Sequence, residues 1–75
     1  MINVGRVCVK LRGREAGKIC AVVKKLDEKF VIIDGPEVKR RRCNIAHLEP
    51  LPKTIDIKED APHEEVVEKL KTISQ

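Results

Sequence analysis

The chain has 75 residues, of which 16 are Lys or Arg and 12 are Asp or Glu, and its only aromatic side chain is Phe30. A chain of this length forms one small domain with a thin core, because it buries only about 60–65% of the surface that it exposes when unfolded. Without Trp or Tyr, an aromatic-lined pocket for a small molecule or an aromatic cage is not expected.

Charge is divided unevenly along the chain. Residues 1–53 hold 13 basic and 6 acidic residues, a net charge of +7, whereas residues 54–75 hold 3 basic and 6 acidic residues, a net charge of −3. A basic body that contacts a polyanion and an acidic tail that does not would produce this division. We therefore expect a basic β domain over 1–53 and an extended segment with a helix over 54–75.

Several classes of protein are disfavoured by what the sequence lacks. Three cysteines without a C-x-x-C spacing argue against a secreted disulfide scaffold. No apolar run approaches the roughly 20 residues that span a bilayer, and the first residues do not resemble a signal peptide. These patterns predict a cytosolic protein without a membrane partner.

The first half of the chain predicts three strands. Apolar and polar residues partly alternate over 5–11, residues 18–26 are apolar on both faces at their centre, and Phe30–Ile33 is β-branched and apolar. A strand that is apolar on both faces is bent or central in a curled sheet, since a flat two-layer sheet would leave one face wet. The turn sequence Asp34–Pro36 ends the third strand.

The middle of the chain completes the sheet. A fourth strand is predicted over Val38–Cys43, a helical turn over 44–48 with Asn44 as its cap, and a short fifth strand within 47–53. Four or five short strands with closely spaced turns predict a mainly β fold, a small antiparallel barrel.

The tail predicts one helix. Asp60 as a cap and Pro62 in the first turn mark the start of a helix over His63–Ile73. Four apolar residues of this helix share one face, which docks either on the chain's own barrel or on another protein: Val66, Val67, Leu70 and Ile73.

The hairpin over 5–23 is the first candidate binding element. Its loop contains Gly13 and Gly17, which permit backbone conformations or close approaches that a Cβ forbids, and the cations Arg12, Arg14 and Lys18. Such a loop suits a polyanion lying against the main chain, although a plain hairpin whose glycines only satisfy turn geometry is the alternative. The strand–loop–strand pattern resembles the KOW motif of ribosomal and transcription proteins.

The second candidate is the run Lys39-Arg40-Arg41-Arg42. In a strand, successive side chains point to opposite faces, so two cations would lie on each side. Arginine clamps phosphate with two parallel hydrogen bonds, which lysine cannot do. The alternative is a solvated edge strand whose charge prevents aggregation.

Metal binding and catalysis have no convincing candidate. Of Cys8, Cys20, Cys43 and His47, only the last two are close in sequence, whereas structural zinc sites bring ligands in tight pairs. We interpret the cysteines as small buried apolar residues, while His47 either packs or contacts phosphate. No hydroxyl stands beside a base, so we expect no enzyme, no cofactor and no small-molecule substrate: the hydroxyls are Thr54, Thr72 and Ser74.

Four blocks together resemble archaeal members of the fourteen-e family of large-subunit ribosomal proteins. The blocks are VGRVC (4–8), GREAG (13–17), FVIIDGP (30–36) and KRRRCNIAHLEP (39–50), and the likeness continues into the helical tail over 60–70. The resemblance implies an SH3-like barrel with a KOW hairpin, bound to large-subunit ribosomal RNA on cytoplasmic ribosomes.

The resemblance and the charge pattern lead to a functional hypothesis. The chain would be a structural component that neutralises phosphate and recognises RNA shape, because aromatic stacking is not available. Its tail would face away from RNA or meet a neighbouring ribosomal protein. The rivals are a free KOW-type RNA-binding factor and a peptide-binding module of the SH3 or Tudor type. RNA contact is expected at Arg6, Lys10, Arg12, Arg14, Lys18, Lys39, Arg40, Arg41, Arg42 and His47.

Overall fold

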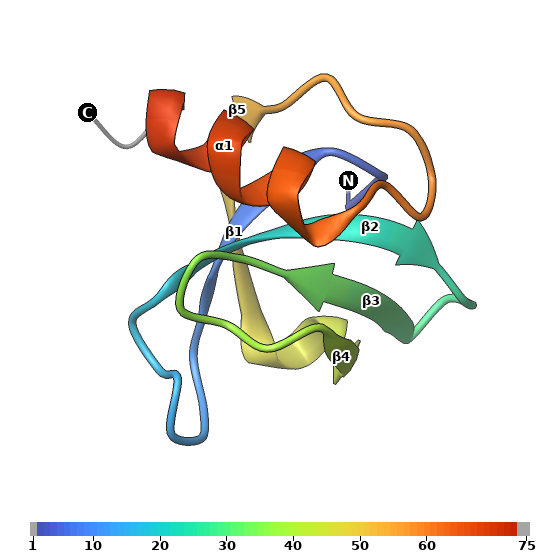
Figure 1. The fold of residues 1–75 in the computed structure, drawn as a ribbon. Coiled ribbons are helices and arrows are strands. Elements are labelled where there is room, and N and C mark those ends of the chain that lie inside the picture. The colour runs from blue at the N-terminus through green and yellow to red at the C-terminus, as the bar shows by residue number, and fades with distance from the viewer. Residues whose placement is uncertain (1, 74–75) are drawn as a thin grey trace.

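Five antiparallel strands form one curled sheet, and a C-terminal helix lies across it (Figure 1). The computed structural model describes residues 2–73. The strands lie in the spatial order β4-β3-β2-β1-β5. This mainly β, barrel-like architecture confirms the predicted fold class. In chain order the elements are β1 (Arg6–Lys10), β2 (Ile19–Lys25), β3 (Phe30–Asp34), β4 (Arg41–Asn44), the 3-10 helix η1 (Ile45–His47), β5 (Leu48–Thr54) and α1 (His63–Ile73).

The central strand β2 is apolar on both faces, as its sequence predicts. Cys20 and Val22 point to one side of the sheet, whereas Ala21 and Val23 point to the other, and all four are fully buried. The register with β3 shifts between Val22 and Lys24, which marks a β-bulge. A bulge bends a strand and increases its twist, so it contributes to the curl of the sheet.

The sheet therefore buries a cluster on each face. The inner core lies inside the curl and consists of Cys8, Cys20, Val22, Val31, Ile33, Val38, Cys43 and Leu48. The helix-side core lies between the other face of the sheet and α1, and consists of Val7, Ala21, Val23, Ile55, Ala61, Val66 and Leu70.

Helix α1 has the bounds that the sequence predicts, and its apolar face docks on its own sheet. Val66 and Leu70 are almost fully buried, and Ile73 packs against the same cluster. Burying two such side chains contributes roughly 3–6 kcal/mol as an upper estimate. The extended segment before the helix adds Ile55, so the tail is part of the fold rather than an appendage.

Two boundaries differ from the sequence predictions. Strand β4 begins at Arg41 and not at Val38, because Val38 turns into the inner core and its carbonyl accepts a hydrogen bond from the Gly35 N–H (3.1 Å). Asp60 does not cap the helix. It lies three residues before the first helical residue, has a positive φ of 62°, and its carboxylate lies 3.6 Å from Lys24 Nζ.

The 3-10 helix η1 confirms the predicted helical turn. The Asn44 side chain accepts a hydrogen bond from the Ala46 N–H at 2.8 Å, as an N-cap residue should. The following strand β5 contains Pro50 and Pro52 and has only one strand neighbour, β1. Proline has no N–H to donate to a neighbouring strand. It is tolerated in an edge strand because one side of that strand forms no ladder hydrogen bonds.

Candidate nucleic-acid interface

The β1–β2 loop is held by a compact set of backbone hydrogen bonds. The Gly17 N–H donates to the Lys10 carbonyl at 2.7 Å, and the Ala16 N–H donates to the Gly13 carbonyl at 3.2 Å. Gly13 and Gly17 have φ values of 86° and 87°, a region that other L-residues rarely adopt. A Cβ at Gly17 would meet no atom within 4 Å, so conformation and not packing requires glycine there.

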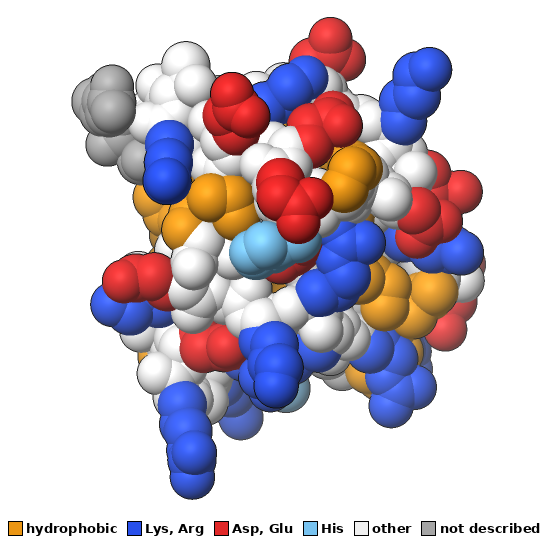
Figure 2. Space-filling view, viewed as in Figure 1, with side chains coloured by type: hydrophobic (Ala, Val, Ile, Leu, Met, Phe, Trp, Pro, Cys, Tyr) orange, Lys and Arg blue, Asp and Glu red, His pale blue; other side chains and the backbone are white. Residues whose placement is uncertain are grey.

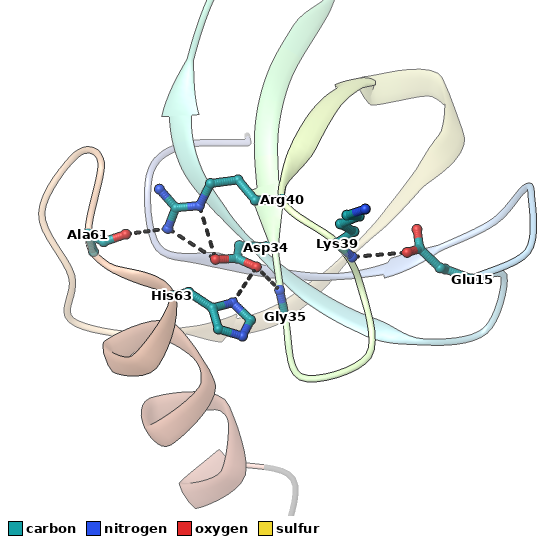
Figure 3. A network of polar contacts seen from close by, with 7 residues as sticks. All are labelled: Glu15, Asp34, Gly35, Lys39, Arg40, Ala61 and His63. Atoms are coloured by element: carbon teal, nitrogen blue, oxygen red, sulfur yellow. Dashed lines mark hydrogen bonds and ion pairs between the residues drawn. The ribbon is translucent and has the colours of Figure 1, made fainter.

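Glu15 joins this loop to the chain before and within β4. Its carboxylate accepts hydrogen bonds from Lys10 Nζ (3.0 Å) and from the Lys39 N–H (2.9 Å; Figure 3), and Arg41 Nη2 lies 3.4 Å away. The hydrogen bond from the Lys39 backbone, followed by that from Lys10, lowers the pKa of Glu15. Two basic blocks that are separate in sequence therefore meet around one carboxylate.

The resulting surface, which we name the basic end, consists of Arg12, Arg14, Lys18, Lys39 and Arg41. In the view of Figure 2, Lys and Arg side chains project from the lowest part of the molecule, where Figure 1 places the β1–β2 loop, while acidic side chains gather over the helix. Arg12 and Arg14 are exposed and make no ion pair or side-chain hydrogen bond within residues 2–73. Lys18 lies 3.1 Å from Glu37, but both side chains are exposed, and such pairs are weak.

Asp34 collects a second set of basic groups, and it is fully buried. One carboxylate oxygen accepts from the Gly35 N–H and lies 2.9 Å from His63 Nδ1, while the other accepts from Arg40 Nε at 3.0 Å (Figure 3). Arg40 also donates to the Ala61 carbonyl. Arg40 thus points toward the helix junction and ties the end of β3 to the start of α1.

Two further predicted contacts are engaged inside the sheet. Lys10 is only 8% exposed and is paired with Glu15. Arg6 Nη1 donates to the Leu51 carbonyl at 3.0 Å, which links β1 to β5. His47 is half-buried at the base of the loop, where its carbonyl accepts a hydrogen bond from the Leu11 N–H at 2.8 Å.

Arg42 occupies a different position from its neighbours. Its guanidinium carbon lies 4.7 Å from the centre of the Phe30 ring. The Phe30 side chain is half-buried and is covered on one side by Arg42.

The three cysteines are buried, free thiols, as expected for small apolar core residues. Burial raises the pKa of Cys8 to about 11 and that of Cys20 to about 12, and it also raises the pKa of Cys43. Within the described part of the chain, no group of His, Cys, Asp and Glu side chains is arranged to hold a metal ion. None of the helices described there is long and apolar enough to cross a membrane.

Comparison with known proteins decides the family. No family model matches the chain. Large ribosomal subunit protein eL14 of Saccharolobus solfataricus is 55% identical over 73 residues, which cover 92% of this chain and 76% of the relative. The eL14 proteins of Staphylothermus marinus (54% over 70 residues; 88% and 73% covered) and Methanococcus maripaludis (57% over 65 residues; 87% and 83% covered) are similarly close. The chain belongs to the eL14 family.

Membership of the eL14 family confirms the resemblance seen in the sequence blocks. The family does not by itself say which side chains of this chain contact RNA. The geometry divides the cations into two groups: Arg6, Lys10 and Arg40 are engaged in internal contacts, whereas the basic end lies at the surface. Within the run Lys39–Arg42 of this eL14 chain, a cation can therefore serve the fold or the surface, and charge alone does not separate the two.

Proposed function

We propose that the chain is a non-catalytic structural component of the large ribosomal subunit, in the cytoplasm, and that it binds ribosomal RNA through phosphate contacts made by the basic end. The identity of its relatives as large ribosomal subunit proteins supports the structural role in this proposal. The arrangement around Glu15 supports the second half.

The observation that carries the RNA proposal is the joining of two basic segments at Glu15. The carboxylate holds the loop beside Lys39 and Arg41, so five cations share one end of the molecule. The open space at Gly17 lets a bulky polyanion approach the main chain there. Contacts of this kind position a protein on RNA without reading its sequence.

Arg6, Lys10 and Arg40 have an indirect part in this proposal. Each holds a segment of the fold, respectively β5, the β1–β2 loop and the helix junction. His47 lies at the base of the β1–β2 loop. It would contact RNA only if the RNA extended beyond the tip of that loop toward its base. The acidic outer side of α1, which includes Glu64 and Glu68, would face away from RNA or toward a neighbouring ribosomal protein.

The first test is the distribution of the protein in a lysate separated on a sucrose gradient, at low and at high salt. Presence in the large-subunit peak, with release only at high salt, is the expected result, since phosphate contacts weaken steeply with salt. Absence from that peak would contradict the ribosomal role and favour a free RNA-binding factor.

The second test measures the salt dependence of RNA affinity for two matched double variants. Arg12→Ala/Arg14→Ala should reduce the slope of log affinity against log salt by about 1.4–1.8, if each side chain neutralises one phosphate. Lys53→Ala/Lys58→Ala removes the same charge from exposed positions away from the loop and should leave the slope nearly unchanged. Equal slopes for the two variants would show that the basic end is not the interface.

A further inference from the structure

Arg42 and Phe30 form a cation–π pair at the surface. Phosphate binding by Arg42 would not require an aromatic ring beside it. The guanidinium carbon lies 4.7 Å from the ring centre, well inside the range of about 6 Å for a cation–π contact. Arg42 is exposed, whereas Phe30 is half-buried. The ring therefore supports one face of the guanidinium, and the side chain as a whole remains accessible.

The sheet register builds this pair. Ile32 lies opposite Arg42, and Phe30 lies opposite Asn44, in the antiparallel pairing of β3 with β4. Phe30 and Arg42 are consequently diagonal neighbours on one face of the sheet. Diagonal neighbours lie roughly 7–8 Å apart at their Cα atoms, a distance that aromatic and long side chains span. Backbone pairing therefore places the two side chains within reach of each other.

Arg42 also differs from the other two arginines of its run. Arg40 is bound to Asp34, and Arg41 lies beside Glu15. Arg42 makes no ion pair and no side-chain hydrogen bond within residues 2–73. Its guanidinium lies over the ring, and its N–H donors make no hydrogen bond within the described residues. A side chain that is already ordered loses less entropy when it binds a ligand.

We propose that Arg42, supported by Phe30, is a stacking site for an unpaired base of RNA. This inference rests on the proposed function and assigns Arg42 a role other than phosphate neutralisation. Unpaired bases in RNA commonly stack on arginine planes as well as on aromatic rings. One aromatic residue is too few for stacking of bases on aromatic rings, but here the arginine supplies the plane and the phenylalanine supports it.

The surroundings favour a neutral base over a phosphate. The Asp27 carboxylate accepts hydrogen bonds from the N–H groups of Lys29 and Phe30 (2.7 and 2.9 Å), so a fixed negative charge sits at the adjacent turn. Asp27 and Arg42 interact electrostatically, so part of the charge of Arg42 is already offset, and stacking of a neutral base does not require a net positive charge. Leu26, which is 44% exposed, leads into the same turn and offers apolar surface.

The test uses a short RNA that carries the fluorescent base 2-aminopurine, either single-stranded or paired in a duplex of the same sequence. The wild-type protein should change the fluorescence of the single strand, because the intensity of this base depends on what it stacks against. Arg42→Lys keeps the charge but removes the plane, and Phe30→Leu keeps apolar volume but removes the ring. Both variants should abolish this fluorescence change and lower single-strand affinity about five-fold or more, with duplex affinity unchanged.

Lys53→Ala is the control, because Lys53 is an exposed cation on β5 outside both the basic end and the Arg42–Phe30 pair. It should retain the fluorescence change, and thermal unfolding of each variant checks that the fold is intact. Absence of any fluorescence change when the wild type binds the single strand, or an equal loss of affinity for both RNAs in Arg42→Lys, would overturn the stacking site while leaving phosphate binding in place. Absence of binding to either RNA would overturn the proposed function as well.

Discussion

Two carboxylates organise the basic part of this molecule, and they do so in opposite ways. Glu15 lies in the surface loop and gathers Lys10, the Lys39 N–H and Arg41. Asp34 is fully buried and gathers Arg40, His63 and the Gly35 N–H. The first cluster holds cations at the surface, and the second holds a cation against the interior.

The difference shows how a run of consecutive cations is divided between fold and surface. Arg40 and Arg41 are adjacent and chemically identical, yet one faces a buried acid and the other a surface acid. The acid that each arginine meets decides whether its outer N–H groups remain open to a ligand. A count of positive charges in the sequence therefore overstates the number of cations that the surface presents to a ligand.

The largest expected effect is on stability, at Asp34. Asp34→Asn removes the charge that Arg40 and His63 face, and we expect a loss of about 2–3 kcal/mol in the free energy of unfolding, because a broken buried pair leaves polar groups uncompensated. Urea unfolding measures it. Asp27→Asn is the control, because Asp27 is exposed and the amide oxygen can still accept from the backbone. Similar losses in the two variants would remove the structural role assigned to Asp34.

Gly35 follows Asp34 and Gly17 lies two residues after Glu15, so substitutions at these glycines compare the packing around the two carboxylates. A Cβ at Gly35 would lie 2.6 Å from the Ile19 carbonyl oxygen, whereas at Gly17 it would meet nothing within 4 Å. Gly35→Ala should cost about 2 kcal/mol through overpacking, and Gly17→Ala about 1 kcal/mol through its positive φ alone. Thermal melting compares them, and a greater loss at Gly17 would contradict the open character of the basic end.

The adjacent arginines separate RNA binding from folding. Arg41→Ala should reduce the salt slope of RNA affinity by about 0.7–0.9, the value for one lost phosphate contact. Arg40→Ala should lower stability and leave that slope unchanged, because its guanidinium is held by Asp34 and the Ala61 carbonyl. Filter binding over a salt series measures both slopes. Equal slopes in the two variants would mean that Arg40 leaves Asp34 to reach RNA.

The smallest expected effect is a dependence of stability on acid pH that comes from Glu15. Its pKa in the folded protein is lowered from an ordinary value of 4.5, so its contribution is complete above that value and is lost as pH falls through the lower folded pKa. Glu15→Gln should unfold at a urea midpoint that changes less with pH below about 4.5 than the wild type does. Parallel curves for the two proteins would show that the carboxylate contacts do not persist in solution.

Most of the fold could be predicted because its signals are local. Apolar runs on both faces placed β2 at the centre of the sheet, and Pro62 with helical spacing gave the bounds of α1. The start of β4 could not be placed, since the burial of Val38 depends on the closed inner core and not on its neighbours in sequence.

The site was predicted less completely, for a physical reason. Asp34 bonds to His63, which lies 29 positions away, and Glu15 bonds to Lys39, which lies 24 positions away. In sequence, both acids look like ordinary turn residues. The one available signal at Asp34 was an acid that directly ends a fully apolar strand, and this same residue also fits a turn. The basic segments were found, but their division between surface and interior required the fold.

The buried thiols give this small protein an internal reporter of its own opening. The chain has no Trp or Tyr, so its unfolding changes near-ultraviolet absorbance and fluorescence very little. Cys8, Cys20 and Cys43 are buried, and burial suppresses the thiolate that alkylating reagents attack. A maleimide at neutral pH should therefore label only molecules in which the fold has opened. The labelling rate would measure how often the inner core, which contains all three cysteines, is exposed.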